Sequence, residues 1–223
     1  MKNNQGYKNQ ALAALSGRWA QAVVCTVVMF LIICALVGPS YIADMSALGM
    51  MPMSLSLVEV LTLVGIPVSI FLVYPLMLGY AIAFNKLVVE GDDALTGNMF
   101  KIMFSGYIRN VWGLFLMSIF IILWSMLLII PGLIKAFSYA MTPYILKDYP
   151  ELSANQAINL SRKMMKGHKF DLFWLNFSFI GWIILCALTL GVAYVWLMPY
   201  MQTANAAFYQ DLKKEYVENN PNN

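Results

Sequence analysis

The chain has 223 residues, of which 61% are hydrophobic and only 11% are charged, whereas soluble domains carry about 25% charged residues. Charge-free stretches run from Trp19 to Ala43, Val60 to Asn85, Asn110 to Ile134 and Leu172 to Gln210, and each is longer than the roughly 20 residues that cross a bilayer core. These features exclude a water-soluble domain and predict an all-α, polytopic membrane protein, while a net charge of +3 requires no nucleic-acid partner.

The first apolar run follows a short basic segment, residues 1–18, as it would in a signal peptide. A signal h-region has only about 7 to 15 apolar residues and ends at a small-residue cleavage site. Here the run is longer and meets Gly38-Pro39. We therefore predict a cytoplasmic amphipathic segment over residues 1–18 and a first transmembrane helix over 19–38. A Met-rich loop (45–53) without Lys or Arg precedes the second helix, at 58–86.

A helical hairpin is predicted for the middle of the chain. Residues 109–130 are rich in Val, Leu, Ile and Phe and should insert without help. The weaker segment 132–148 carries Lys135, whose charge is costly at membrane depth. Lys135 falls in the first turn, where its stem can reach the interface. We expect Pro131-Gly132 to be the turn between the two helices.

The last apolar run, from Leu172 to Gln210, contains 39 residues. That length is too great for one span, because an α-helix rises about 1.5 Å per residue. We expect a break at Thr189-Leu190-Gly191, helices over 170–187 and 191–213, and a polar tail over 214–223. Pro199 is expected to kink the final helix, since proline removes a backbone hydrogen bond.

The basic residues favour six transmembrane helices, arranged as three hairpins in a domain from 19 to 213. With six spans, thirteen of the 14 Lys and Arg residues share one side of the membrane, and only Lys135 approaches the other. Lys and Arg accumulate on the cytoplasmic side. Both termini are therefore predicted to be cytoplasmic. An interfacial aromatic belt is expected from Trp19, Tyr41, Tyr107, Trp112, Tyr144, Tyr149 and Trp174.

A threefold pattern accompanies the predicted hairpins. Each hairpin follows an amphipathic stretch that ends in Gly, a basic residue and an aromatic, at Gly17, Gly106 and Gly167. Pro75 and Phe84 also have the same spacing as Pro199 and Phe208. We interpret the pattern as a repeated insertion unit. The alternative is a transport architecture, in which sites lie at the interface between repeats.

Residues 153–168 are predicted to form an amphipathic helix in the membrane interface. Ser153 and Gln156 make a capping box, and Gly167 suits the helix end. Basic side chains beside an anionic leaflet each gain about 1 kcal/mol. We expect them to anchor the helix, with recognition of a lipid headgroup or a protein partner as the alternative. The candidate contacts are Arg162, Lys163, Lys166 and Lys169.

Residues suited to chemistry are scarce. The candidate polar residues at membrane depth are the neutral Asn176, Gln202 and Asn205. Hydrogen bonding between helices explains them more simply than substrate binding. His168 is the only histidine, and a hydrogen-bonding role is favoured over a metal site, for which Glu151 and Asp171 would be weak partners.

No sequence motif indicates catalysis or a cofactor. Cys25, Cys34 and Cys186 fall in apolar runs and are interpreted as small buried hydrophobes. The chain has no His-Glu-x-x-His, Gly-x-Ser-x-Gly or phosphate-binding glycine loop. We therefore expect a protein that is not an enzyme and holds no cofactor.

The segment Lys147-Asp148-Tyr149-Pro150-Glu151-Leu152-Ser153 continues through Met165-Lys166-Gly167-His168-Lys169 to Pro199-Tyr200 and Ala207-Phe208-Tyr209. From about Pro131 to Leu212 it resembles a bacterial family of integral membrane proteins known as a domain of unknown function. It is more distantly similar to the membrane region of membrane-anchored glycerophosphodiester phosphodiesterases. The resemblance implies a six-helix domain in the bacterial cytoplasmic membrane and no particular activity.

These observations lead to two functional hypotheses. The first is a non-enzymatic protein of the bacterial cell envelope that acts through contacts with membrane lipids, chiefly anionic headgroups, or with a protein partner. The second is a small-solute transporter or channel in which Asn176, Gln202 and Asn205 line a path. A central polar cavity would favour the second hypothesis, and a solid apolar bundle would favour the first.

Overall fold

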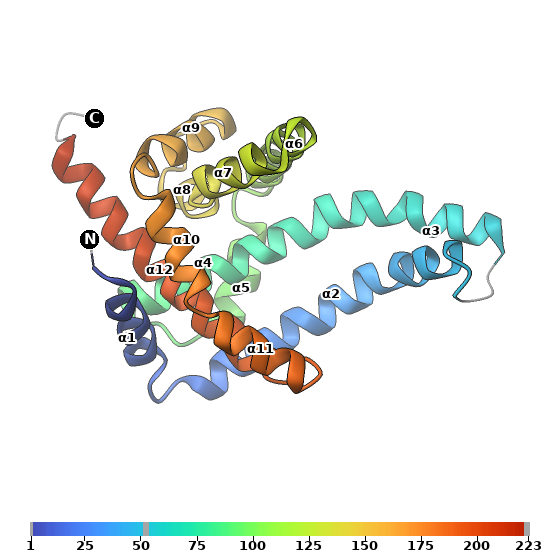
Figure 1. Ribbon diagram of the computed structural model, residues 1–223, viewed down its shortest axis with the longest axis horizontal. Coiled ribbons are helices and arrows are strands. Elements are labelled where there is room, and N and C mark those ends of the chain that lie inside the picture. Colours follow the sequence, from blue (N-terminus) through green and yellow to red (C-terminus); the bar gives the residue numbers. More distant parts are fainter. Residues whose placement is uncertain (1, 51–53, 221–223) are drawn as a thin grey trace.

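The structure, a computed structural model, describes residues 2–50 and 54–220, and no strand occurs in those ranges (Figure 1). The Met-rich segment 45–53 thus lies partly outside the described residues. The helices are α1 (Asn4–Leu15), α2 (Trp19–Ala47), α3 (Leu55–Val68), α4 (Tyr74–Glu90), α5 (Leu95–Phe104), α6 (Tyr107–Leu127), α7 (Ile129–Tyr139), α8 (Thr142–Asp148), α9 (Ala154–Met164), α10 (Lys169–Phe177), α11 (Ile180–Leu188) and α12 (Tyr194–Asn219).

The second predicted span is longer and less regular than expected. A π-helical turn, η1 (Ser69–Val73), joins α3 to α4, so that the helical run reaches from residue 55 to residue 90. Pro67 lies just before η1 and Pro75 just after it. A proline cannot donate a backbone hydrogen bond, and such local changes of hydrogen bonding are a recognised cause of irregular helix geometry.

The turn in the middle of the chain was predicted at the wrong residue. The helix breaks at Leu128, whose backbone is extended (φ −160°, ψ 143°), and Pro131 lies in the first turn of α7. Proline fits there because the first backbone N–H groups of a helix have no partner within the helix. Gly132 then lets α7 approach α6, since a Cβ at this position would lie 2.7 Å from the Ser125 Cα.

The last apolar run contains one more break than predicted. The expected break is present, because Leu190 and Gly191 both have positive φ angles (51° and 89°). An additional turn at Ser178 and Phe179 separates α10 from α11. The final helix has Pro199 in its interior, as expected. It continues to Asn219, so most of the predicted polar tail is helical.

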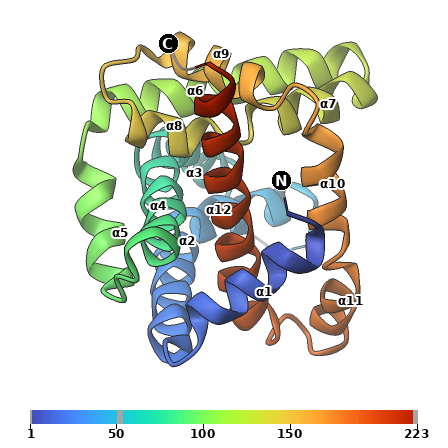
Figure 2. The ribbon, with the colours of Figure 1, turned by 90° about the vertical axis from the view of Figure 1, so that its left-hand side faces the viewer.

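Helix α12 lies in the middle of the view in Figure 2, at the end of the molecule from which α2 and α3 project (Figure 1). It packs against α1, α2, α4, α9, α10 and α11, and much of its length is buried, including Thr203, Ala204, Ala207 and Phe208. The three short helices α1, α5 and α9 each contact a helix near this centre: α1 packs on α12, α5 on α4, and α9 on α8. Each short helix is followed by a glycine with positive φ, at Gly17, Gly106 and Gly167.

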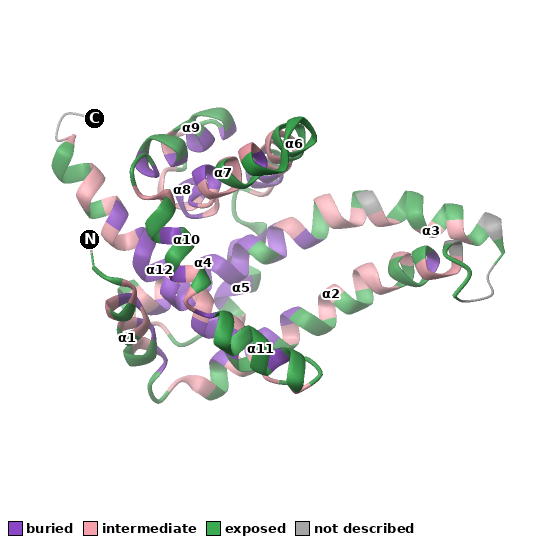
Figure 3. Ribbon diagram, viewed as in Figure 1, coloured by how far each residue is buried: buried purple, intermediate pink, exposed green. Residues whose placement is uncertain are grey.

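Five helical stretches of the described residues are long and apolar enough to cross a membrane. Many large apolar side chains of α3, α6 and α11 are exposed, and long parts of these helices have the colour of exposed residues in the ribbon of Figure 3. Such side chains require an apolar surrounding. Helix α12, the expected sixth span, is not among the five, which are Trp19–Ser46, Leu57–Glu90, Tyr107–Leu127, Ile129–Asp148 and Lys169–Leu188.

Candidate functional site

A cavity of about 530 Å³ lies between α4, α6, α7, α8, α10 and α12. We call it the central cavity. All three candidate polar residues, Asn176, Gln202 and Asn205, line it, although they come from two helices. The chain reverses direction between α10 and α12, so that α12 passes beside α10. This reversal brings Asn176 to the same cavity as Gln202 and Asn205.

The polar residues of the central cavity form a small hydrogen-bonded group. Gln202 Nε2 donates to the Tyr144 hydroxyl at 2.9 Å. Asn176 Nδ2 donates to the Leu172 carbonyl oxygen at 2.9 Å and lies 3.5 Å from Asn205 Oδ1. Gln202 Oε1, Asn176 Oδ1 and Asn205 Nδ2 have no hydrogen-bond partner in the described part of the chain. The group therefore offers both free acceptors and a free donor.

The rest of the central cavity is apolar and soft. Four methionines line it, Met77, Met117, Met141 and Met198, and its wall contains no Asp, Glu, Lys, Arg or His. Methionine side chains adapt to ligands of irregular shape. Ligand sites commonly combine an apolar wall with a few polar groups that fix orientation. This cavity is suited to an uncharged molecule with an apolar body and one polar end.

Tyr144 is the residue of this group that sequence analysis placed wrongly. It was assigned to an interfacial belt, but it is only 3% exposed and stacks on Tyr209 with ring centroids 4.8 Å apart. One indication that Tyr144 belongs to a helix was present in the sequence, because Thr142-Pro143 begins α8 in the same way that Tyr74-Pro75 begins α4. Both prolines occupy the first turn, where they are well tolerated.

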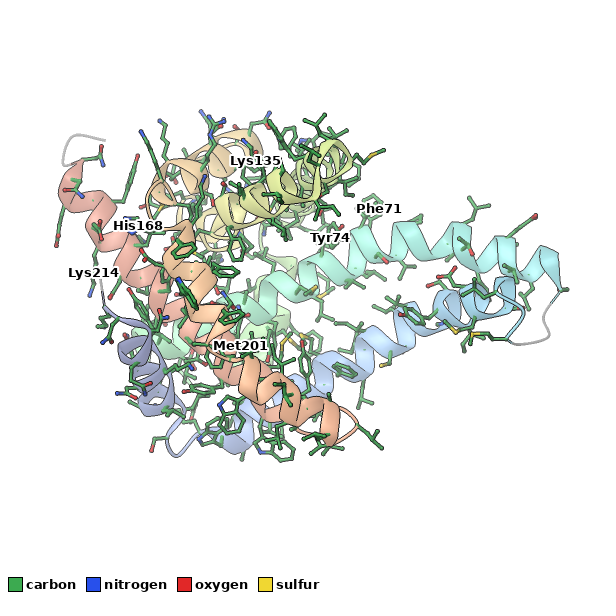
Figure 4. The ribbon with its side chains drawn as sticks, in the orientation of Figure 1. Phe71, Tyr74, Lys135, His168, Met201 and Lys214 are labelled. Atoms are coloured by element: carbon green, nitrogen blue, oxygen red, sulfur yellow. The ribbon has the colours of Figure 1, made fainter. Side chains whose placement is uncertain are left out.

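A second cavity adjoins the central one. This outer cavity has a volume of about 400 Å³ and shares Tyr74 and Ser118 with the central cavity. Ser69 of the π-helical turn and Asp44 of α2 also line it. Tyr74 lies just beyond Phe71 of that turn on the long helical run (Figure 4). Turns of this kind often occur at functional sites.

The predicted basic contacts lie elsewhere, on α9 and the start of α10. Arg162, Lys163 and Lys166 are exposed and Lys169 is half-buried. The capping box is confirmed, since Ser153 and Gln156 exchange side-chain and backbone hydrogen bonds. The opposite face of α9 is buried, and the helix packs against α6, α7 and α8. Its apolar residues therefore contact protein, which leaves the cations on the free face.

His168 lies between two carboxylates. Its Nδ1 is 3.2 Å from Asp171 Oδ2, and its Nε2 is 3.1 Å from Glu215 Oε1. Sequence analysis considered Asp171 but missed Glu215, which comes from the far end of α12. Among residues 2–50 and 54–220, no group of three His, Cys, Asp or Glu residues could hold a metal ion. The contacts tie the start of α10 to α12.

Fold and cavity together define an all-helical protein with the apolar helices of a membrane-embedded chain. Within that class the chain belongs to the family described as a protein of unknown function (DUF975), whose family model matches residues 40–216. Helix α1 precedes the matched region. No match was found among curated proteins or among solved structures. The distant resemblance to glycerophosphodiester phosphodiesterases therefore gains no support from these comparisons.

Proposed function

We propose that this chain is a non-enzymatic integral membrane protein of the bacterial cell envelope that binds an uncharged, lipid-like molecule in its central cavity. Its membrane domain would have six spans in three hairpins, with α12 as the sixth, and both termini in the cytoplasm. The distribution of Lys and Arg supports this topology. The resemblance to a bacterial membrane family supports the location.

The observation that carries the proposed binding is the composition of the central cavity. Free donor and acceptor atoms of Asn176, Gln202 and Asn205 gather at one place, and the remaining wall is mainly apolar and carries no Asp, Glu, Lys, Arg or His. A charged ligand would lose its hydration there without gaining a counter-ion. A glyceride or a fatty alcohol, by contrast, would bury its chain and hydrogen-bond its polar end.

The test measures binding of a fluorescent monoacylglycerol to the purified chain in detergent. Replacing Gln202 or Asn205 by Leu removes hydrogen-bonding groups, each worth about 0.5–1.5 kcal/mol, and should weaken binding roughly two- to tenfold. Asn159→Leu, an exposed change on α9, is the matched control and should leave affinity unchanged. Equal affinity for all four proteins would contradict binding in the central cavity.

Transport is the second candidate, because two cavities adjoin. The outer and central cavities share Tyr74 and Ser118, so a solute could pass from one to the other along η1 and α4. Single cysteines at positions 176, 202 and 205 should then react with a small aqueous thiol reagent. Complete protection of all three, with an exposed cysteine at position 159 reacting normally, would remove a water-accessible path.

The cations of α9 support a separate contact with anionic lipid. Arg162 and Lys163 of α9 and Lys166 of the turn that follows it are exposed, and juxtamembrane cations are attracted to an anionic leaflet. Reversing the three charges to Glu should reduce the number of anionic lipids that co-purify with the protein. An unchanged lipid composition would show that these cations do not select lipids.

A further inference from the structure

A third cavity, which we call the lysine cavity, lies where the ends of α4 and α8 meet α12. Its volume is about 350 Å³. Each of the three helices contributes one lysine and at least one other polar side chain: Asn85, Lys86 and Glu90 from α4, Lys147 and Asp148 from α8, and Gln210 and Lys213 from α12. Positions more than one hundred residues apart in sequence therefore supply positive charge to one small space.

Two of the three lysines are available to a ligand. Lys213 is already engaged, because its Nζ is 2.6 Å from Asp148 Oδ2. Lys147 makes a single 3.2 Å hydrogen bond to the Ser105 hydroxyl, and Lys86 makes no side-chain hydrogen bond or ion pair within residues 2–50 and 54–220, although its charge helps to lower the pKa of Asp92. The Asp148 carboxylate is also occupied, since the same oxygen accepts a 2.8 Å hydrogen bond from the Tyr209 hydroxyl.

Asn85 adds a neutral donor with a fixed orientation. It is 5% exposed, and Gln210 Nε2 donates to its Oδ1 at 2.7 Å. Its Nδ2 group has no acceptor in the described part of the protein. Asn85 lines the cavity, and its Nδ2 is not among the fully buried polar atoms of the described residues that lack a partner, so this donor is open to an acceptor in the cavity.

We propose that the lysine cavity binds a phosphate group, with Lys86, Lys147 and Asn85 donating to its oxygen atoms. Three lysines face two carboxylates, Glu90 and Asp148, so one positive charge is in excess, and the pairing of Asp148 with Lys213 leaves Lys86 and Lys147 facing Glu90 alone. Hydrogen bonds from charged donors to phosphate are among the stronger ones in proteins. The lysine cavity differs in place and chemistry from the uncharged central cavity. Either binding proposal can therefore be wrong while the other holds.

The competing explanation is that the lysines only stabilise the C-terminal ends of nearby helices. Both α4 and α8 end beside this cavity, and cations near a helix C-terminus are stabilised by the helix dipole. That explanation predicts that loss of a lysine lowers thermal stability and has no effect on ligand binding. The proposal predicts an effect on binding as well.

The experiment uses the full chain in a neutral detergent, with thermal unfolding measured at increasing concentrations of two probes. Inorganic phosphate represents a soluble source, and short-chain phosphatidic acid represents a lipid headgroup. Lys86→Gln and Lys147→Gln should each weaken binding roughly tenfold, because each removes one charged hydrogen bond. Lys214→Gln is the matched control, since this exposed lysine of α12 does not line the cavity (Figure 4).

A second variant tests how the charge of the lysine cavity affects phosphate binding. Asp148→Asn retains an acceptor for Tyr209 but releases Lys213, so it should strengthen phosphate binding. Binding of inorganic phosphate that depends on Lys86 supports a soluble ligand, and binding of phosphatidic acid alone supports a lipid. No binding of either probe, or equal binding by Lys86→Gln and wild type, would overturn the proposal.

Discussion

Close contacts between helices depend on single small residues, and Gly79 is the strongest case. A Cβ at this position of α4 would overlap the Met99 carbonyl oxygen of α5 and lie 3.1 Å from the Met99 carbonyl carbon. Backbone atoms cannot move aside as a flexible side chain can. Small residues allow such approaches between membrane helices.

We expect Gly79→Ala to destabilise the protein by about 1–3 kcal/mol, the usual cost of overpacking. Thermal unfolding in detergent, followed by circular dichroism, measures the loss. Gly97→Ala is the control, because Gly97 lies in α5 with nothing within 4 Å of its added Cβ. Alanine there should be neutral or stabilising. Equal stability of Gly79→Ala and wild type would show that α4 and α5 are not packed this closely.

For single residues, the sequence indicated which side chains are chemically unusual, but not which of them lie together in the fold. Asn176, Gln202 and Asn205 stand out because amide side chains are rare in apolar runs. Nothing in their spacing shows that Tyr144 would accept a hydrogen bond from Gln202 across 58 positions. The lysine cavity was missed for the same reason, since its members come from three distant helices.

At the scale of elements, α1 shows that the amino-terminal segment is part of the core. Tyr7, Ala11 and Leu15 are buried at helical spacing, and Tyr7 makes an edge contact with Phe208 of α12 at 5.4 Å between centroids. Lys8 Nζ donates to the Ser178 carbonyl oxygen at 2.8 Å, and burial lowers the pKa of Lys8. Helix α1 thus fastens α12 and the turn after α10.

Tyr7→Ala should therefore release α1. Truncating a buried aromatic side chain costs about 3–5 kcal/mol, which exceeds what a 12-residue helix can recover alone in water. Faster amide hydrogen exchange in α1 would report the release. Leu12→Ala, at a position that is 42% exposed, should leave exchange unchanged. Protection of α1 in the Tyr7 variant would contradict this docking.

Apolar runs located the long helices well, whereas breaks inside the runs were harder to find. Leu190-Gly191 was predicted because glycine adopts positive φ at little cost. The breaks at Leu128 and at Ser178-Phe179 carry no Gly or Pro at the break itself. The break at Leu128 is accompanied by a close approach of Gly132 to Ser125, a contact that a single sequence does not display.

At the scale of the whole molecule, α12 explains why counting spans by hydropathy gives five while the charge distribution favours six. This helix carries Asp211, Lys213, Lys214, Glu215 and Glu218 in its second half, and the residues buried by neighbouring helices lie in its middle, between Leu197 and Leu212. A helix enclosed by protein has no need for an apolar surface on every side. Its amide and hydroxyl groups then become available to the central cavity.

In the proposed topology, α12 crosses the membrane and both chain ends lie in the cytoplasm. The direct measurement is labelling of single cysteines at Leu12 and Glu218, in a chain whose native cysteines are replaced, with a reagent that cannot cross membranes. Both positions should label in inverted membrane vesicles and remain unlabelled in cells with an intact cytoplasmic membrane. Labelling of the two positions from opposite sides would contradict the six-span topology and the enclosed position of α12.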